Sequence, residues 1–120
     1  GGFVRTEAGK QRFVIRGEII NNYPDRRRFI QVKASILDEK GRTVRARTAY
    51  AGNVFTQEEL TGQPMATLEK GMDRRSGKER RNTAVASGGS IPFVVVFQDL
   101  PKYISEFTVE AVRSAPAGTT

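Results

Sequence analysis

Residues 28 to 52 read RFIQVKASILDEKGRTVRARTAYAG, and this stretch decides the fold. Apolar and more polar side chains alternate over residues 29–37 and again over 43–50, as in strands that bury one face. Between the two runs, Asp38 can accept hydrogen bonds from amides two residues on, and Gly41 can adopt a positive φ. The stretch therefore predicts a β-hairpin. On its second strand, we expect one face to carry Val44, Ala46, Thr48 and Tyr50 and the other to carry Thr43, Arg45, Arg47 and Ala49.

Three more runs with strand patterning flank the hairpin. Residues 11 to 21 predict a first strand, in which Gly17 marks either a bulge or a position without a side chain to pack. Residues 91 to 98 predict a strand that is apolar on both faces, and residues 105 to 113 predict the last strand. Short links favour antiparallel pairing, so we expect an all-β fold, an immunoglobulin-like antiparallel β-sandwich of five strands or slightly more. The expected core comprises Ile15, Ile19, Ile30, Val32, Ile36, Val44, Phe93, Val95, Phe97, Phe107 and Val109.

A short helical insertion is predicted between the third and fourth strands, at about residues 56 to 90. Thr56 stands three positions before Glu59, which is the capping-box pattern of a helix start. Met65, Leu68 and Met72 then recur at helical spacing. The rest of the insertion, from position 73 onward, is almost wholly polar and rich in glycine, so we expect a mobile loop there.

The length of 120 residues leaves room for one domain. The expected boundaries are a disordered or extended segment at 1–10, the sandwich at 11–114 and a disordered tail at 115–120. The chain opens without Met, and we expect it to be a domain excised from a longer protein. Its longest uninterrupted apolar run, Phe93 to Phe97, is far shorter than the roughly 20 residues that cross a bilayer, so we expect the domain itself to be soluble.

The residue types exclude most familiar enzyme designs. The chain has no Cys and no His, so the usual zinc ligands and the nucleophile pairs built on a thiol or an imidazole are missing. Carboxylates remain, but Asp38 and Asp99 are explained as turn formers, and Glu58 and Glu59 as residues of a first helical turn. We therefore expect no enzymatic activity, no catalytic residue, no cofactor, no metal and no small-molecule substrate.

A formal net charge of +7 favours anionic partners, although interspersed charge also serves solubility. The basic residues fall in three clusters. Arg45 and Arg47 share one strand face and could line a patch with Lys33 across the hairpin. Such patches suit nucleic acid or anionic lipid head groups, but the aromatic rings that would stack on bases are mostly expected inward. The candidates for anion or partner binding are Arg26, Arg27, Arg28, Lys33, Arg45, Arg47, Arg74, Arg75, Lys78, Arg80 and Arg81.

Several apolar residues fall on faces that the alternation places outward. Either the helical insertion covers them or they form an exposed patch for a protein partner. The sequence leaves both readings open. These residues are Phe29, Leu37, Val94, Val96 and Val112.

A family resemblance rests on four short motifs: RGEIINN at 16–22, KASILD at 33–38, Gly41, and GGSIPF at 88–93. On these residues the chain resembles a bacterial family of unknown function, whose members carry this domain behind an N-terminal zinc ribbon and one transmembrane helix. The domain is similar to the Phe-x-Leu-Tyr-Asp type of immunoglobulin-like sandwich. The chain departs from that type in having Ala34 and Leu37 in place of Phe and Tyr, a Ser-Gly in place of Pro-Gly before the last motif, and the helical insertion.

The resemblance implies an accessory domain of a membrane-anchored bacterial protein, on the extracytoplasmic side, and it supplies no catalytic residue. The function predicted from the sequence is a non-catalytic interaction or structural module with an unidentified protein partner. The alternative is a basic anion-binding module that contacts nucleic acid or anionic lipid head groups.

Overall fold

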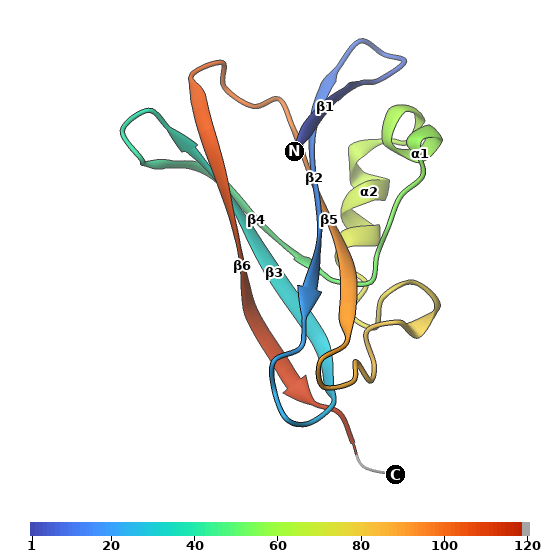
Figure 1. Ribbon diagram of the computed structural model, residues 1–120. Coiled ribbons are helices and arrows are strands. Elements are labelled where there is room, and N and C mark those ends of the chain that lie inside the picture. Colours follow the sequence, from blue (N-terminus) through green and yellow to red (C-terminus); the bar gives the residue numbers. More distant parts are fainter. Residues whose placement is uncertain (119–120) are drawn as a thin grey trace.

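The computed structural model describes residues 1–118, which form a mostly β domain with two antiparallel sheets and a pair of short helices (Figure 1). The elements are β1 (Gly2–Arg5), β2 (Gln11–Ile20), β3 (Arg27–Asp38), β4 (Thr43–Tyr50), α1 (Gln57–Gly62), α2 (Met65–Met72), the 3-10 turn η1 (Lys78–Arg80), β5 (Ser90–Gln98) and β6 (Ile104–Pro116). One sheet has the strand order β1-β2-β5, and the other has the order β4-β3-β6. The β-rich class predicted from the sequence is confirmed.

The ends of the chain contain more strand than the sequence predicted. Gly2–Arg5 pairs with the start of β2, which gives six strands among the described residues and puts the helices after the fourth strand instead of the third. At the other end, β6 continues to Pro116, which pairs with Arg27, so the expected disordered tail begins inside a strand. Residues 119 and 120 of that tail lie outside the described residues.

The core lies between the two sheets. Ile15 and Val95 lie opposite each other on β2 and β5 and are buried, and each such aliphatic side chain stabilises the fold by about 1.5–3 kcal/mol. Gly17 is not a bulge: the Phe93 ring lies over it, and a Cβ added there would approach that ring to 2.8 Å. Most of the predicted core is buried, but Phe107 is exposed, and three others are only half-buried: Ile19, Val44 and Val109.

The β3–β4 hairpin forms as predicted at its turn. Asp38 Oδ1 accepts hydrogen bonds from the amides of Arg42 at 3.0 Å and Lys40 at 2.9 Å, and these donors lower the pKa of Asp38. Gly41 has a φ of 74°, a conformation that glycine adopts without strain.

The inward face of β4 is the opposite of the predicted one. Thr43 pairs with Leu37 but Arg45 pairs with Ile36, so Val44 is an extra residue at a register shift. Beyond this bulge, the residues that share the buried face of β3 are Arg45, Arg47 and Ala49. The prediction that Ala46, Thr48 and Tyr50 face inward is therefore wrong, because alternation alone does not locate a bulge.

The helices close one edge of the fold, on the side of β5 away from β6 (Figure 1). The predicted capping box is present, since the Thr56 hydroxyl accepts from the Glu59 amide and the Glu59 carboxylate accepts from the Thr56 amide. Met72 Sδ accepts a hydrogen bond from the Val96 amide at 3.3 Å, so α2 covers the β5 edge that β2 leaves free and buries Val96. Among residues 1–118, the helices are too short or too polar to span a bilayer.

Residues 73–90 are packed into the fold, which corrects the expectation of a mobile loop. Asn82 is fully buried; its side-chain oxygen accepts from the Ile30 amide at 2.9 Å, and its amide group donates to the carbonyls of Ile30 and Ala51, both at 3.0 Å. Val85 and Arg27 exchange two backbone hydrogen bonds. The polar composition of the segment led to the wrong prediction. The Asn82 side chain makes hydrogen bonds with buried backbone groups, as the backbone of a neighbouring strand would.

Candidate functional site

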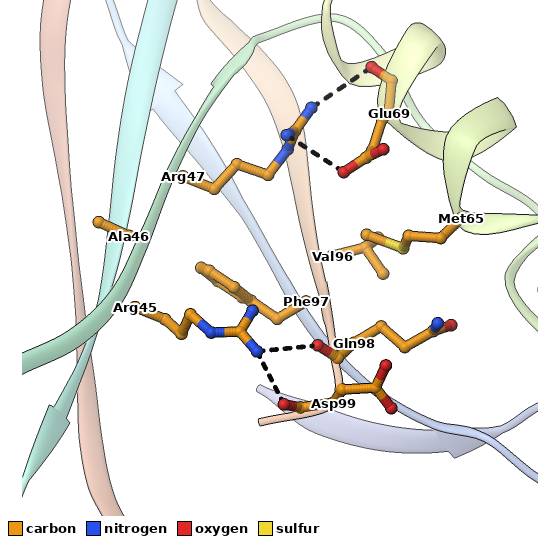
Figure 2. A pocket seen from close by; sticks show the side chains of 9 residues that line it. All are labelled: Arg45, Ala46, Arg47, Met65, Glu69, Val96, Phe97, Gln98 and Asp99. Carbon is orange, nitrogen blue, oxygen red and sulfur yellow. Dashed lines mark hydrogen bonds and ion pairs between the residues drawn. The ribbon is translucent and has the colours of Figure 1, made fainter. Parts of the chain in front are cut away.

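The predicted patch of Arg45, Arg47 and Lys33 does not form. The two arginines project from β4 toward α2 and the end of β5 (Figure 2). Lys33 pairs with Thr48, on the other face of the sheet. Because residues paired across two strands share a face, Lys33 lies on the far side of the sheet from both arginines.

Both arginines are engaged within the chain. Arg45 Nη2 donates to the Asp99 carbonyl at 2.7 Å. Arg47 Nη2 donates to the Asp73 carboxylate at 3.2 Å, and its Nη1 lies 3.7 Å from the Glu69 carboxylate. The cavity of about 390 Å³ between them is lined by acidic as well as basic residues, so its positive charge is largely compensated. We call this side of the fold, formed by β4, β5, α2 and Asn82, the closed side.

The other two basic clusters meet at one corner of the molecule. Arg28, near the start of β3, and Arg75 and Arg80, which follow α2 in the chain, line one cavity of about 650 Å³. The ring of Phe29 lies beside two of them: the guanidinium carbons of Arg28 and Arg75 are 4.9 and 4.3 Å from its centroid. The structure thus joins two clusters that are about 45 positions apart in the sequence.

The remaining members of these clusters are held elsewhere or dispersed. The guanidinium of Arg27 lies 3.9 Å from the centre of the Tyr23 ring and 3.7 Å from the Asp25 carboxylate. Arg81 lies 3.8 Å from the Glu79 carboxylate. The others are exposed or half-buried at the surface: Arg26, Arg74 and Lys78.

The side between β2 and β6 is lined with exposed apolar side chains. The Phe13 ring is 4.8 Å from that of Phe3 and 5.7 Å from that of Phe107, centre to centre. Phe3 is 55% exposed and Phe107 38%, and farther along the same side Ile20 is 59% and Val112 44% exposed. Single exposed apolar residues are ordinary, but a set along one side marks an interaction surface. We call this surface, formed by Phe3, Phe13, Ile20, Phe107 and Val112, the open side.

Two cavities lie at opposite ends of the open side. One, of about 590 Å³, is lined by Phe13 and Phe107, and the other, of about 260 Å³, is lined by Ile20 and Val112. Each is bounded by residues of both sheets. The two sheets therefore leave space between them along this side, where β2 and β6 lie apart (Figure 1).

β6 has the longest unpaired strand edge in the described part of the chain. It is 13 residues long, it pairs with β3 on one edge, and no strand among residues 1–118 pairs with its other edge. It contains no Lys, and its only Pro is its last residue, Pro116. Lysines, prolines and covering elements are the usual means of blocking such an edge. On β5, by contrast, Met72 covers the free edge.

The open side could not be found by reading the sequence. Alternation places Phe13 and Phe107 on inward faces correctly, since Phe107 pairs with Ile36. It does not say whether the opposite sheet reaches far enough to cover them. Phe3 lies in a segment that the sequence predicted only as disordered or extended, so the aromatic cluster had no signal of its own.

The fold and its surfaces define a small, mostly β domain of two three-stranded antiparallel sheets, closed on one side and open on the other. A family model matches residues 1–111, and the chain belongs to that family, which carries the description "Protein of unknown function (DUF3426)". The resemblance to a family of unknown function is thereby confirmed. The chain matches no curated protein and no solved structure.

Proposed function

We propose that this domain is a non-catalytic interaction module that binds an extended segment of a partner protein as an added strand on β6. The observation that carries the proposal is an uncovered strand edge running along an exposed apolar surface. When a strand adds to an open edge, main-chain hydrogen bonds supply affinity, and pockets for alternate side chains supply selectivity.

The inner face of β6 fits such an occupant. Phe107, Val109 and Ala111 alternate along that face, opposite the buried residues of β3. A strand added at the free edge continues the sheet, so every second side chain of that strand falls on the same face, over the open side. The cavities at Phe13 and Ile20 lie where two of those side chains can be accommodated. Covering the exposed rings contributes about 25 cal/mol per Å² of apolar surface removed from water.

The absence of catalysis is part of the proposal. It is supported by a sequence without Cys or His and by carboxylates that serve the fold, since Glu69 and Asp73 hold Arg47 and Asp38 holds its turn. A reproducible turnover that is abolished by one carboxylate substitution would contradict it.

We also propose that the domain belongs to a larger protein that is anchored in a membrane. The motif resemblance described above supports an immunoglobulin-like sandwich in a larger, membrane-anchored bacterial protein, with this domain on the extracytoplasmic side. The full-length sequence tests this directly, since the proposal requires a transmembrane helix outside residues 1–120.

Anion binding, the alternative function, is favoured by one observation, the convergence of Arg28, Arg75 and Arg80 at a cavity. Strand addition takes precedence because the rest of the basic residues do not form one surface. Arg45 and Arg47 are engaged on the closed side, and Lys33 lies apart.

Selection from a phage-displayed library of random peptides, each as long as β6, tests strand addition. The selected peptides should bind the Phe107→Ser variant about ten-fold more weakly than the wild type, because a central apolar contact is lost. Tyr103→Ser is the matched control: Tyr103 is an exposed ring that lines neither cavity of the open side, and its loss should leave binding unchanged. Failure to select any peptide, or equal binding by both variants, would contradict the proposal.

A further inference from the structure

We propose that the corner formed by Arg28, Phe29, Arg75 and Arg80 is a binding site for a compact anion with at least two phosphate groups, such as pyrophosphate or the diphosphate of a larger molecule. The corner is distinct from the open side, and its occupation does not depend on strand addition at β6.

Hydrogen bonds to Asn82 join the two chain segments that form the corner. The Phe29 amide donates to the Asn82 carbonyl at 2.9 Å, and the next amide, of Ile30, donates to the Asn82 side chain at 2.9 Å. These bonds hold the start of β3 against the segment that carries Arg75 and Arg80. Because Asn82 is fully buried, the backbone segments that carry the positive charge are held in one arrangement before any ligand arrives.

The backbone at the corner adopts conformations that L residues rarely use. Phe29 has a φ of 53°, at a register shift between β3 and β6, and Glu79 and Arg80 have φ values of 57° and 59°. Such strained residues persist only where the surroundings impose the conformation, commonly at ligand sites. The hydrogen bond from the Phe29 amide to Asn82 maintains this conformation, in which the Phe29 ring lies beside the guanidinium groups of Arg28 and Arg75.

The positive charge of the corner is not compensated. Among the described residues, the side chains of Arg28, Arg75 and Arg80 take part in no ion pair, and the cavity lining contains no carboxylate. A guanidinium that rests on a ring keeps its N–H groups available, and their planar fork matches the oxygens of a phosphate. Two hydroxyl groups complete the lining, from Ser76 and Thr83.

The geometry selects among anions. Three guanidinium groups place three positive charges around the cavity of about 650 Å³, and a diphosphate balances this charge more fully than a single phosphate does. The Phe29 ring is already contacted by two guanidinium groups and is therefore not free to stack on a base. Recognition at this corner thus rests on phosphate groups, not on nucleobases.

Calorimetric titration with pyrophosphate tests the assignment. Arg28→Gln and Arg75→Gln should each weaken binding about ten-fold, as expected for loss of one charge-assisted contact, and added salt should weaken it further. Arg16→Gln is the matched control, since it removes the same charge from an exposed position on β2 and should leave binding unchanged. Unaltered thermal unfolding shows that each variant is folded.

Three results would overturn the proposal. Arg16→Gln could weaken pyrophosphate binding as much as the corner variants, which would make the effect one of net charge. Pyrophosphate could fail to bind at low salt. Binding that depends on Arg28 and Arg75 could appear only with phosphatidylglycerol vesicles or only with single-stranded oligothymidine, which would assign the corner to a membrane or to nucleic acid. The corner variants should still bind the peptides selected for β6, so the two proposals can fail separately.

Discussion

The closed and open sides of this domain both run the length of a strand pair, but they end differently. On the closed side, Met72 occupies the β5 edge, Arg47 reaches α2, and Asn82 joins β3 to the segment after α2. On the open side, Phe13 and Phe107 contact each other across the gap and Gly1 lies against both rings, but no helix of the described chain covers them and Phe107 remains 38% exposed. The closed side is sealed by buried apolar side chains such as Leu68 and Met72 together with these polar contacts, whereas the open side leaves apolar side chains exposed.

The difference indicates that the closed side contributes most to the stability of the domain and that the open side is available for binding. Polar groups on the closed side satisfy buried backbone atoms, so removing one leaves partners unsatisfied, and the cost is large. Apolar groups on the open side are already partly in contact with water, so removing one forfeits little folding energy. Side chains of the open side can therefore be substituted, or can bind a partner, with little loss in the stability of the fold.

The largest effect should come from Asn82→Ala on the closed side. The change leaves the Ile30 amide and the Ala51 carbonyl buried without partners and removes one of the two donors to the Ile30 carbonyl, so we expect a loss of about 3–5 kcal/mol in the free energy of unfolding, measured with urea. Trypsin should then cut at the arginines around position 80. Asn22→Ala, at an exposed position, is the control and should change stability by less than about 0.5 kcal/mol. A cost below about 1 kcal/mol for Asn82→Ala would break the comparison.

The second prediction compares the loss in free energy of unfolding when one apolar side chain is truncated on the closed side and one on the open side. Leu68→Ala, at a fully buried position of α2, should cost about 3 kcal/mol through lost burial and a cavity, whereas Phe107→Ala should cost about 1 kcal/mol, although it removes more atoms. Thermal and urea unfolding of both variants measure the two values. Equal costs would mean that the open side is a core and not a binding surface.

A smaller effect is expected at the arginines that close the β4 side. Arg47→Gln should reduce the free energy of unfolding by about 1 kcal/mol, because Arg47 is partly shielded from water and holds both Glu69 and Asp73. Lys33→Gln removes the same charge from the outer face of the same hairpin and should cost less than about 0.5 kcal/mol. If both changes cost the same, Arg47 is a surface charge and does not close the fold.

The smallest effect concerns Asp38, at the hairpin turn. Its pKa in the folded state lies below the ordinary value of 3.8, mainly because the Arg42 amide donates to it, so its stabilising contribution is complete above that value and is lost as the pH falls through the folded-state pKa. Asp38→Asn should therefore make stability less sensitive to acid in this range. Unfolding curves of both proteins measured at a series of acidic pH values would show the difference, and parallel losses of stability would contradict the prediction.

The local elements of the fold were accessible from the sequence. The turn at Asp38 and Gly41 and the capping box at Thr56 and Glu59 each depend on side-chain chemistry within a few residues, and both are present. The β-rich class followed from period-two patterning for the same reason.

The features that set the surfaces apart were not accessible, because they depend on contacts between distant segments. One extra residue at Val44 turned Arg45 and Arg47 to the buried face, which removed a predicted patch. One buried side chain, Asn82, ordered a segment that its composition marked as loop and brought Arg75 to Arg28. Val44 and Asn82 can be seen in the sequence, but the strand that each of them contacts cannot be inferred from the sequence alone.

Hydrogen exchange of the individual backbone amides in the free domain tests the central claim most directly, namely that the β6 edge is open while the β5 edge is closed. Amides of β6 that point away from β3 should exchange as fast as those of exposed loops, while the Val96 amide, on the outer edge of β5, should exchange slowly because it donates to Met72. Met72→Ala should release the Val96 amide without altering β6. If the outward amides of β6 are as slow to exchange as that of Val96, the edge is already covered, and the proposal of strand addition is wrong.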